Sequence, residues 1–284
     1  MNARGYSIAE LLVALVIAGI VGIALSKLII NQSRFLQSQD NYRQARSGAR
    51  SSLTIPTDEL RMVTGGGADS ALVQASRDSF SVRVPYAYGM VCGNSGGATH
   101  IALFPADSAT YAGATPSGYV WRDSTGVLHR ASIISIGAGS GTVCSTTANP
   151  PITVLSATGW SATVVAVTPQ IIAPNSVGAI AYLYRQIRYV FATSGQLPGR
   201  RALWRVLLAA GTRDELVAPF DTSAHFEYLV GDALTATMTP AVLDSVEGVR
   251  FVMVGASQNN APGGSAPVTF NLTSNILFRN RALH

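Results

Sequence analysis

An apolar run over residues 8–30 is the strongest hydrophobic pattern in the chain. About 20 apolar residues, at a rise of 1.5 Å each, are enough for a helix to cross a hydrocarbon core of about 30 Å. Arg4 precedes the run, which favours that end staying in the cytoplasm while the rest is exported. We therefore predict a membrane-spanning helix over residues 6–30, after a short leader at residues 1–5.

A second helical pattern follows the apolar run. Its apolar residues are spaced by seven, three, four and four positions, which places them on one face of a helix with a period of 3.6 residues. Pro56 should kink or end this helix. We predict an amphipathic extension over residues 31–64 that lays its apolar stripe on a sheet. The stripe consists of Phe35, Tyr42, Ala45, Ala49 and Leu53.

Beyond residue 64 the pattern changes to the alternation of strands. Apolar Phe80, Val82 and Val84 alternate with polar residues, as in a half-buried strand. We predict an α+β fold, in which the long N-terminal helix packs on a C-terminal antiparallel β-sheet. The exported domain covers residues 65–284, with a β-rich insertion at about 87–170. Further strands are predicted at 101–104, 119–122, 133–136, 163–167, 179–191, 202–208, 226–229, 249–254 and 268–277.

Composition and charge restrict the class of protein without defining it. Apolar residues make up 48% and charged residues 12%, which excludes a disordered chain. The net charge is +5, with one basic cluster at Arg200, Arg201 and Arg205. A solvated surface is the ordinary interpretation of this cluster, and contact with nucleic acid is the alternative. The acidic pair Asp214–Glu215 is interpreted as a surface turn.

The chain has two cysteines, Cys92 and Cys144. An even count in an exported protein favours one disulfide, and two free buried thiols are the alternative. Neither cysteine has metal-ligand spacing, the four histidines form no metal motif, and no G-x-S-x-G sequence occurs. We therefore expect no metal, no cofactor and no enzymatic activity. An anchored periplasmic enzyme is a further hypothesis, which would require a pocket with clustered carboxylates or histidines, and no sequence motif indicates one.

Glu10 distinguishes between the possible functions of the apolar run. A cleaved secretory signal is one alternative, since residues 24–26 resemble an A-x-A site, and a plain signal anchor is another. A carboxylate inside such a segment costs roughly 2.5–3.5 kcal/mol at the membrane centre and less near an edge. Neither a secretory signal nor a plain anchor needs a carboxylate that is so costly to insert. Glu10 therefore points to a functional role with a partner charge.

Residues 4–14, Arg-Gly-Tyr-Ser-Ile-Ala-Glu-Leu-Leu-Val-Ala, resemble the prepilin cleavage and methylation motif of type IV pilins and type II secretion pseudopilins. In that family the prepilin peptidase cuts after the glycine that corresponds to Gly5. It then N-methylates the new first residue, here Tyr6, where the family usually has Phe. Glu10 corresponds to the glutamate at the fifth mature position. The resemblance implies that Glu10 pairs with the amine of Tyr6 or of a neighbouring subunit.

The C-terminal part is similar to minor pilins of the PilW type and to the J-type pseudopilin, at residues 187–191, 202–205, 215–220 and 246–251. This resemblance implies a structural subunit that initiates or caps a filament. Its expected partners are the prepilin peptidase, other pilins or pseudopilins, and inner-membrane lipid. The expected location is the bacterial inner membrane with the C-terminal domain in the periplasm, and then the filament. The alternative is a pilus-tip adhesin or a DNA-uptake subunit that binds nucleic acid.

Overall fold

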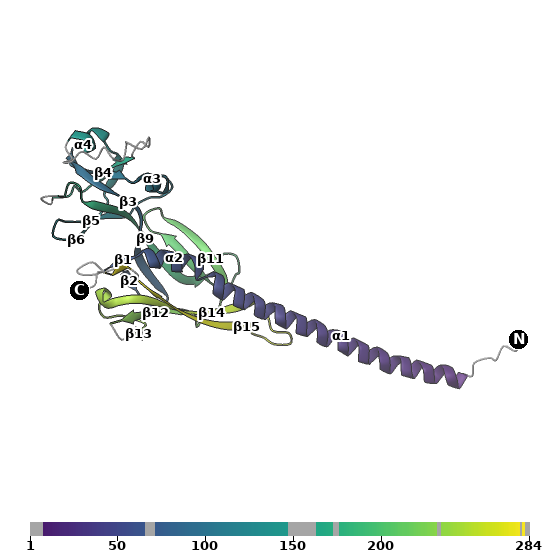
Figure 1. Ribbon diagram of the computed structural model, residues 1–284. Coiled ribbons are helices and arrows are strands. Elements are labelled where there is room, and N and C mark those ends of the chain that lie inside the picture. Colours follow the sequence, from purple (N-terminus) through teal and green to yellow (C-terminus); the bar gives the residue numbers. More distant parts are fainter. Residues whose placement is uncertain are drawn as a thin grey trace.

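A computed structural model describes residues 8–65, 72–146, 163–172, 176–231, 234–278 and 280–281 of the chain. A long helix projects from a β-rich body (Figure 1), and its N-terminal part extends far from every labelled strand. The helix packs on a large antiparallel sheet through its C-terminal part. The predicted α+β class is therefore confirmed.

The helical region is divided near Pro56. Helix α1 covers Ile8–Ser51, and helix α2 covers Thr54–Met62. Pro56 lies in the first turn of α2, where its missing N–H removes no hydrogen bond that the helix needs. Its ring would clash with the carbonyl four residues earlier, at Ser52, in a continuous helix. The chain breaks its helix at this point, as the proline predicts.

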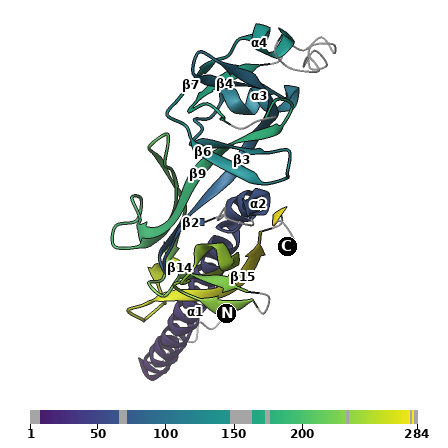
Figure 2. The ribbon, with the colours of Figure 1, turned by 90° about the vertical axis from the view of Figure 1, so that its left-hand side faces the viewer.

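Two long strands form the spine of the body. Strand β3 (Ser79–Ser95) pairs antiparallel with β9 (Ile180–Thr193) along most of its length. A register shift between Pro85 and Ala87 divides this ladder into two parts. Figure 2 shows both strands running from the region around α2 up to the region around α3. Two regions with separate apolar clusters therefore share the same two strands.

The lower region holds the larger cluster, which is centred on aromatic side chains. Phe80, Phe226 and Phe251 contact one another edge to face, with ring centroids 4.8–5.9 Å apart. The strands of this region are β2 (Leu72–Ala75), β10 (Arg201–Leu207), β11 (Thr212–Phe220), β12 (His225–Val230), β13 (Thr235–Thr237), β14 (Val246–Asn260) and β15 (Pro267–Leu277), with a 3₁₀ turn at Leu243–Ser245 and a parallel pair of β1 (Thr64–Gly65) and β16 (Asn280–Arg281).

The upper region has its own apolar cluster, to which Ile101, Tyr119, Val167 and Leu183 contribute. The segment predicted as an insertion supplies most residues of the cluster, and the first half of β9 contributes Ala181 and Leu183. The elements here are β4 (Ala98–Leu103), α3 (Pro105–Ala112), β5 (Gly118–Arg122), β6 (Leu128–Ser132), β7 (Ser135–Ala138), α4 (Gly141–Thr146) and β8 (Val164–Thr168).

The predicted disulfide is present in this upper region. Cys92 of β3 is bonded to Cys144 of α4, with Cα atoms 4.6 Å apart. Both residues are buried beside Ala102. The bond ties α4 to the end of the spine.

Two predictions about the strands are wrong. The pair Asp214–Glu215 does not form a surface turn but lies inside β11, where β10 supplies the ladder partners. The strand predicted at 133–136 spans the gap between β6 and β7, and Ile134 in that gap is 82% exposed. The other predicted strands coincide with observed ones.

Candidate membrane and assembly helix

The C-terminal half of α1 is fixed to the sheet at the point where two strands diverge. Strands β11 and β14 share one ladder pair, Phe220 with Gly255. Ala45 and Ala49 of α1 are fully buried at this place. A Cβ on Gly255 would lie only 2.2 Å from the carbonyl oxygen of Ala45. The missing side chain of Gly255 is therefore what lets helix and strand approach so closely.

Two polar side chains of α1 bind the main chain of β14 beyond this point. Gln44 Oε1 accepts a hydrogen bond from the backbone N–H of Gln258 at 2.9 Å. Asn41 Nδ2 donates to the backbone carbonyl of Asn260 at 3.2 Å, and Asn41 is 4% exposed. These bonds give partners to strand groups that β11 does not pair. Neither residue was predicted from the sequence, although both flank the apolar stripe.

The predicted stripe contacts the sheet only in part. Tyr42 meets Phe270 of β15 edge to face, with ring centroids 5.7 Å apart, and Leu53 packs against the lower cluster. The prediction is wrong for Phe35, which is 63% exposed. This residue lies nearly two helical turns before Tyr42, the first residue of the stripe that contacts the sheet.

The N-terminal half of α1 leaves its apolar side chains without cover. Every large apolar side chain from Ile8 to Ile30 is exposed by 50% or more. At 1.5 Å per residue this segment is roughly 34 Å long, enough for a hydrocarbon core of about 30 Å. An exposed apolar surface of this size indicates contact with a membrane or with other proteins.

Glu10 lies in the first turn of α1, at the N-terminal end of the exposed apolar segment. A carboxylate at this position stabilises a helix through its dipole. Gly5 and Tyr6, the predicted cleavage and methylation site, lie outside the described residues. The structure therefore places Glu10 on the helix but does not describe the amine with which it is predicted to pair.

Helix α2 is joined to the sheet by a buried ion pair that no local sequence pattern predicts. Arg205 Nε of β10 donates to Glu59 Oε1 at 3.1 Å, and the side chains are 13% and 9% exposed. The hydroxyl of Tyr189 on β9 also donates to Glu59. Burial alone would lower the pKa of Arg205, but the hydrogen bond and charge of Glu59 outweigh it and raise the pKa.

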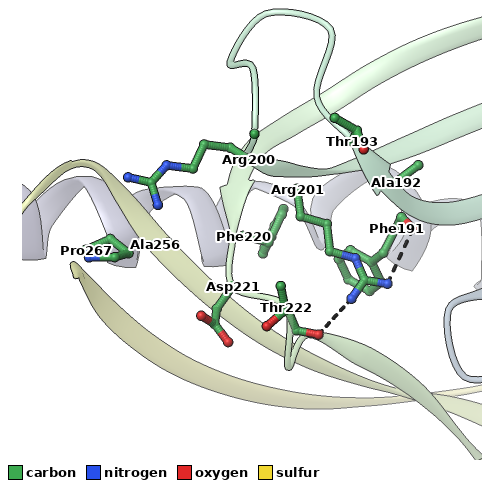
Figure 3. Close-up of a pocket in the computed structure, with 11 residues that line it drawn as sticks. Phe191, Ala192, Thr193, Arg200, Arg201, Phe220, Asp221, Thr222, Ala256 and Pro267 are labelled. Carbon is green, nitrogen blue, oxygen red and sulfur yellow. Dashed lines mark hydrogen bonds between the residues drawn. The ribbon is translucent and has the colours of Figure 1, made fainter. Parts of the chain in front are cut away.

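The basic cluster predicted at Arg200, Arg201 and Arg205 does not form one exposed patch. Arg205 is buried against Glu59. Arg201 lies 2.6 Å from Asp78 and donates to the carbonyl of Thr222 at 2.8 Å. Figure 3 shows its guanidinium beside the Phe191 ring, within a pocket of about 410 Å³.

The third arginine of this cluster also contacts the protein. Arg200 donates to the carbonyl of Gln258 at 3.1 Å. The three arginines thus connect neighbouring strands and loops. Arg201 and Arg205 are ion-paired, whereas the hydrogen bonds of Arg200 go to neutral acceptors.

The other charged pair noted in the sequence is similarly engaged. Glu215 accepts hydrogen bonds from the Ser194 hydroxyl at 2.5 Å and from the Gly195 N–H at 2.7 Å. Asp214 lies 3.8 Å from Arg205. Among the described residues, no three His, Cys, Asp or Glu side chains gather as metal ligands.

The fold and this helix define an α+β protein with one described helix that is long and apolar enough to cross a membrane. Comparisons with models of protein families, with curated proteins and with solved structures find no match.

Proposed function

We propose that the protein is a minor pilin or pseudopilin, a structural subunit that helps to initiate or cap a type IV pilus or a type II secretion pseudopilus. One observation carries the proposal. The exposed apolar segment at residues 8–30 and the sheet-packed segment at residues 41–49 belong to the same helix, α1. A membrane anchor and a structural element of the folded domain are thus continuous.

This continuity favours an assembly helix over a cleaved secretory signal. A signal peptide is needed only for export, and nothing requires it to extend into the helix that packs on the folded domain. Here cleavage near Ser26 would cut α1 in the middle. A helix bundle would instead use both halves, because neighbouring subunits could cover the apolar half while the other half holds the β domain.

Glu10 has a defined role in this proposal. After cleavage behind Gly5, the new amine of Tyr6 would lie one helical turn before Glu10, on the same face. In a bundle, Glu10 would neutralise this amine in its own or a neighbouring subunit. The pairing would offset part of the cost of placing each charge in apolar surroundings. Glu10 would thereby set the depth at which neighbouring helices meet.

Mass analysis of the mature N-terminus tests the proposal. The chain is expressed with its native membrane-targeting segment, with and without a prepilin peptidase. We expect a mature chain that begins at N-methylated Tyr6 only when the peptidase is present. A chain that begins at Lys27 would show a secretory signal instead, and a chain that stays uncleaved would show a plain anchor. Either result would refute the proposal.

Two matched variants make the assay specific. Gly5→Leu places a bulky residue before the predicted cut and should block processing. Ala24→Leu alters the A-x-A-like site and should leave the mature mass unchanged except for the substitution. Loss of the mature form in Ala24→Leu but not in Gly5→Leu would support the secretory interpretation. A third variant, Glu10→Ala, is expected to be processed but to enter filaments or subunit complexes poorly.

A further inference from the structure

Three arginines of α1 form an exposed row at the border of the sheet, where Arg46 also lies 6.0 Å from the centre of the Phe270 ring of β15. Arg43, Arg46 and Arg50 are spaced by three and four residues, so they share one helix face. The buried residues Ala45 and Ala49 lie on the adjoining face, which packs on the sheet. The three arginines line one open hollow of about 530 Å³, between the short side chains of Ser47, Ser51 and Thr54.

The charges of this row are mostly uncompensated. Arg43 lies 3.9 Å from Asp40, but the two side chains are 80% and 76% exposed, so this pair contributes little. In the part of the chain that the structure describes, no carboxylate lies within ion-pair distance of Arg46 or Arg50. The row therefore differs from Arg201 and Arg205, whose guanidinium groups are ion-paired within the protein.

An apolar surface adjoins the row on the side of the membrane segment. Leu36 is 62% exposed and lies seven residues before Arg43, on the same face of the helix. Phe35 beside it is 63% exposed. We call Leu36, Arg43, Arg46 and Arg50 the arginine face. It combines one exposed apolar side chain, Leu36, with a row of positive charges that spans about 10 Å of the helix axis.

We propose that the arginine face binds an acidic helix face on a different, membrane-anchored subunit. The inference rests on the proposed function, since the neighbour must stand beside α1 with its own apolar helix in the membrane. Two such helices stand side by side and parallel, so the stretch that follows the membrane segment of one lies beside the same stretch of the other. A carboxylate row on the neighbour would then meet Arg43, Arg46 and Arg50 directly.

A second copy of this chain does not fit the same face. Between Asn31 and Ser51 the helix carries four arginines and a single acidic residue, Asp40, so a parallel copy brings arginines and no carboxylate row to this face, and like charges in contact repel. The arginine face thus disfavours a homopolymer along this side of α1. It selects for an unlike neighbour, as expected for a subunit present in few copies.

Nucleic acid fits this face less well than an acidic helix. A phosphate backbone would find the arginines but nothing to match Leu36 and Phe35, which lie between the row and the membrane segment. An amphipathic acidic helix would complement both these apolar side chains and the row of arginines.

The test supplies the missing acidic face on the protein itself. The variant Arg43→Glu/Arg46→Glu/Arg50→Glu is made in the full-length chain and mixed with wild type in detergent micelles. Förster transfer between labelled chains gives the dissociation constants of the like and the mixed pairs. Contacts between the apolar segments are common to all pairs and cancel in the comparison. We expect the mixed pair to associate about tenfold more tightly than either like pair, and high salt to remove the difference.

The triple glutamine variant at the same positions is the matched control. It removes the charges while keeping long polar side chains, so its mixture with wild type should gain nothing. Equal association of like and mixed pairs, in chains shown by mass to begin at Tyr6, would overturn the inference and leave the proposed function intact. Salt-dependent binding of a short DNA duplex by wild type, lost in the glutamine variant, would overturn it in favour of nucleic acid.

Discussion

Glu59 of α2 and Arg205 of β10 form a buried ion pair across 146 residues of sequence. The carboxylate accepts from the arginine Nε and Nη2 atoms and from the Tyr189 hydroxyl. These contacts join the second helix to the two neighbouring strands β9 and β10. The end of the helical region therefore depends on a charge that only the folded sheet can supply.

Glu59→Gln should destabilise the protein markedly. The substitution leaves the guanidinium of Arg205 buried without its counter-charge, which typically costs about 3 kcal/mol or more. A loss near this lower value is expected, because Asp214 stays 3.8 Å from Arg205 and partly compensates its charge. Urea unfolding of the full-length chain in detergent, followed by circular dichroism of the β domain, measures the loss.

Asp58→Asn is the matched control for this prediction. Asp58 is exposed on the same helix and loses the same charge, so its effect should stay within about 0.5 kcal/mol. The double variant Glu59→Met/Arg205→Met should recover part of the loss, because it removes both buried charges. If Glu59→Gln were no more destabilising than Asp58→Asn, the pair would not hold α2 on the sheet.

Gly255→Ala should loosen the contact between α1 and β14. The new methyl group would meet the carbonyl of Ala45 at 2.2 Å, so helix or strand must move. Overpacking of this kind costs typically 1–3 kcal/mol. Hydrogen exchange should report faster exchange at the end of α1, around Ala49.

A strand glycine with open space serves as the control for Gly255. At Gly137 of β7, a Cβ would meet no atom within 4 Å, and alanine should be tolerated there. Similar unfolding free energies for Gly255→Ala and Gly137→Ala would show that the close approach is not required.

Removal of the Cys92–Cys144 bond should destabilise the upper region. The bond joins residues separated by 52 positions, and a loop of this length corresponds to about 4 kcal/mol in the chain-entropy model. Thermal unfolding with and without a reductant measures the loss. The variant Cys92→Ala/Cys144→Ala should match the reduced protein and be insensitive to the reductant. A stability unchanged by reduction would contradict the prediction.

Local patterns were sufficient to predict much of the fold. The spacing of Ala45 and Ala49 predicted the buried face of α1, and Pro56 predicted the break after it. The alternation at Phe80 and other sites predicted most strands. The disulfide was predictable because the chain offers only one pair of cysteines.

The parts that were missed depend on sheet order. Strand β11 was hidden by Asp214 and Glu215, whose charges suit a turn until Ser194 and Arg205 are brought beside them. Likewise, no local signal pairs Glu59 with a distant arginine. The arginines singled out by clustering in sequence are engaged in the folded protein, while those spread along α1 at helical spacing share an exposed face.

Alkaline unfolding should expose two buried tyrosines. Burial, and then the charge of Glu59, raise the pKa of Tyr189 well above its usual value near 10. Burial likewise raises the pKa of Tyr228, although a backbone N–H from Ser76 to its oxygen opposes this. The folded state thus favours the neutral phenols. Their contribution to stability is complete below about pH 10 and is lost as pH rises towards the folded-state pKa values.

The free energy of unfolding should therefore depend on pH in the alkaline range. Above about pH 10 the unfolded chain releases these protons while the folded chain retains them, so the free energy of unfolding falls with pH, by up to about 1.4 kcal/mol per unit for each tyrosine. Part of the tyrosinate absorbance should therefore appear only together with the loss of β-sheet circular dichroism. In Tyr189→Phe/Tyr228→Phe this delayed part should shrink, and the fall of the unfolding free energy with pH should become shallower. Complete ionisation with the sheet intact would show that the two phenols are accessible in the folded protein.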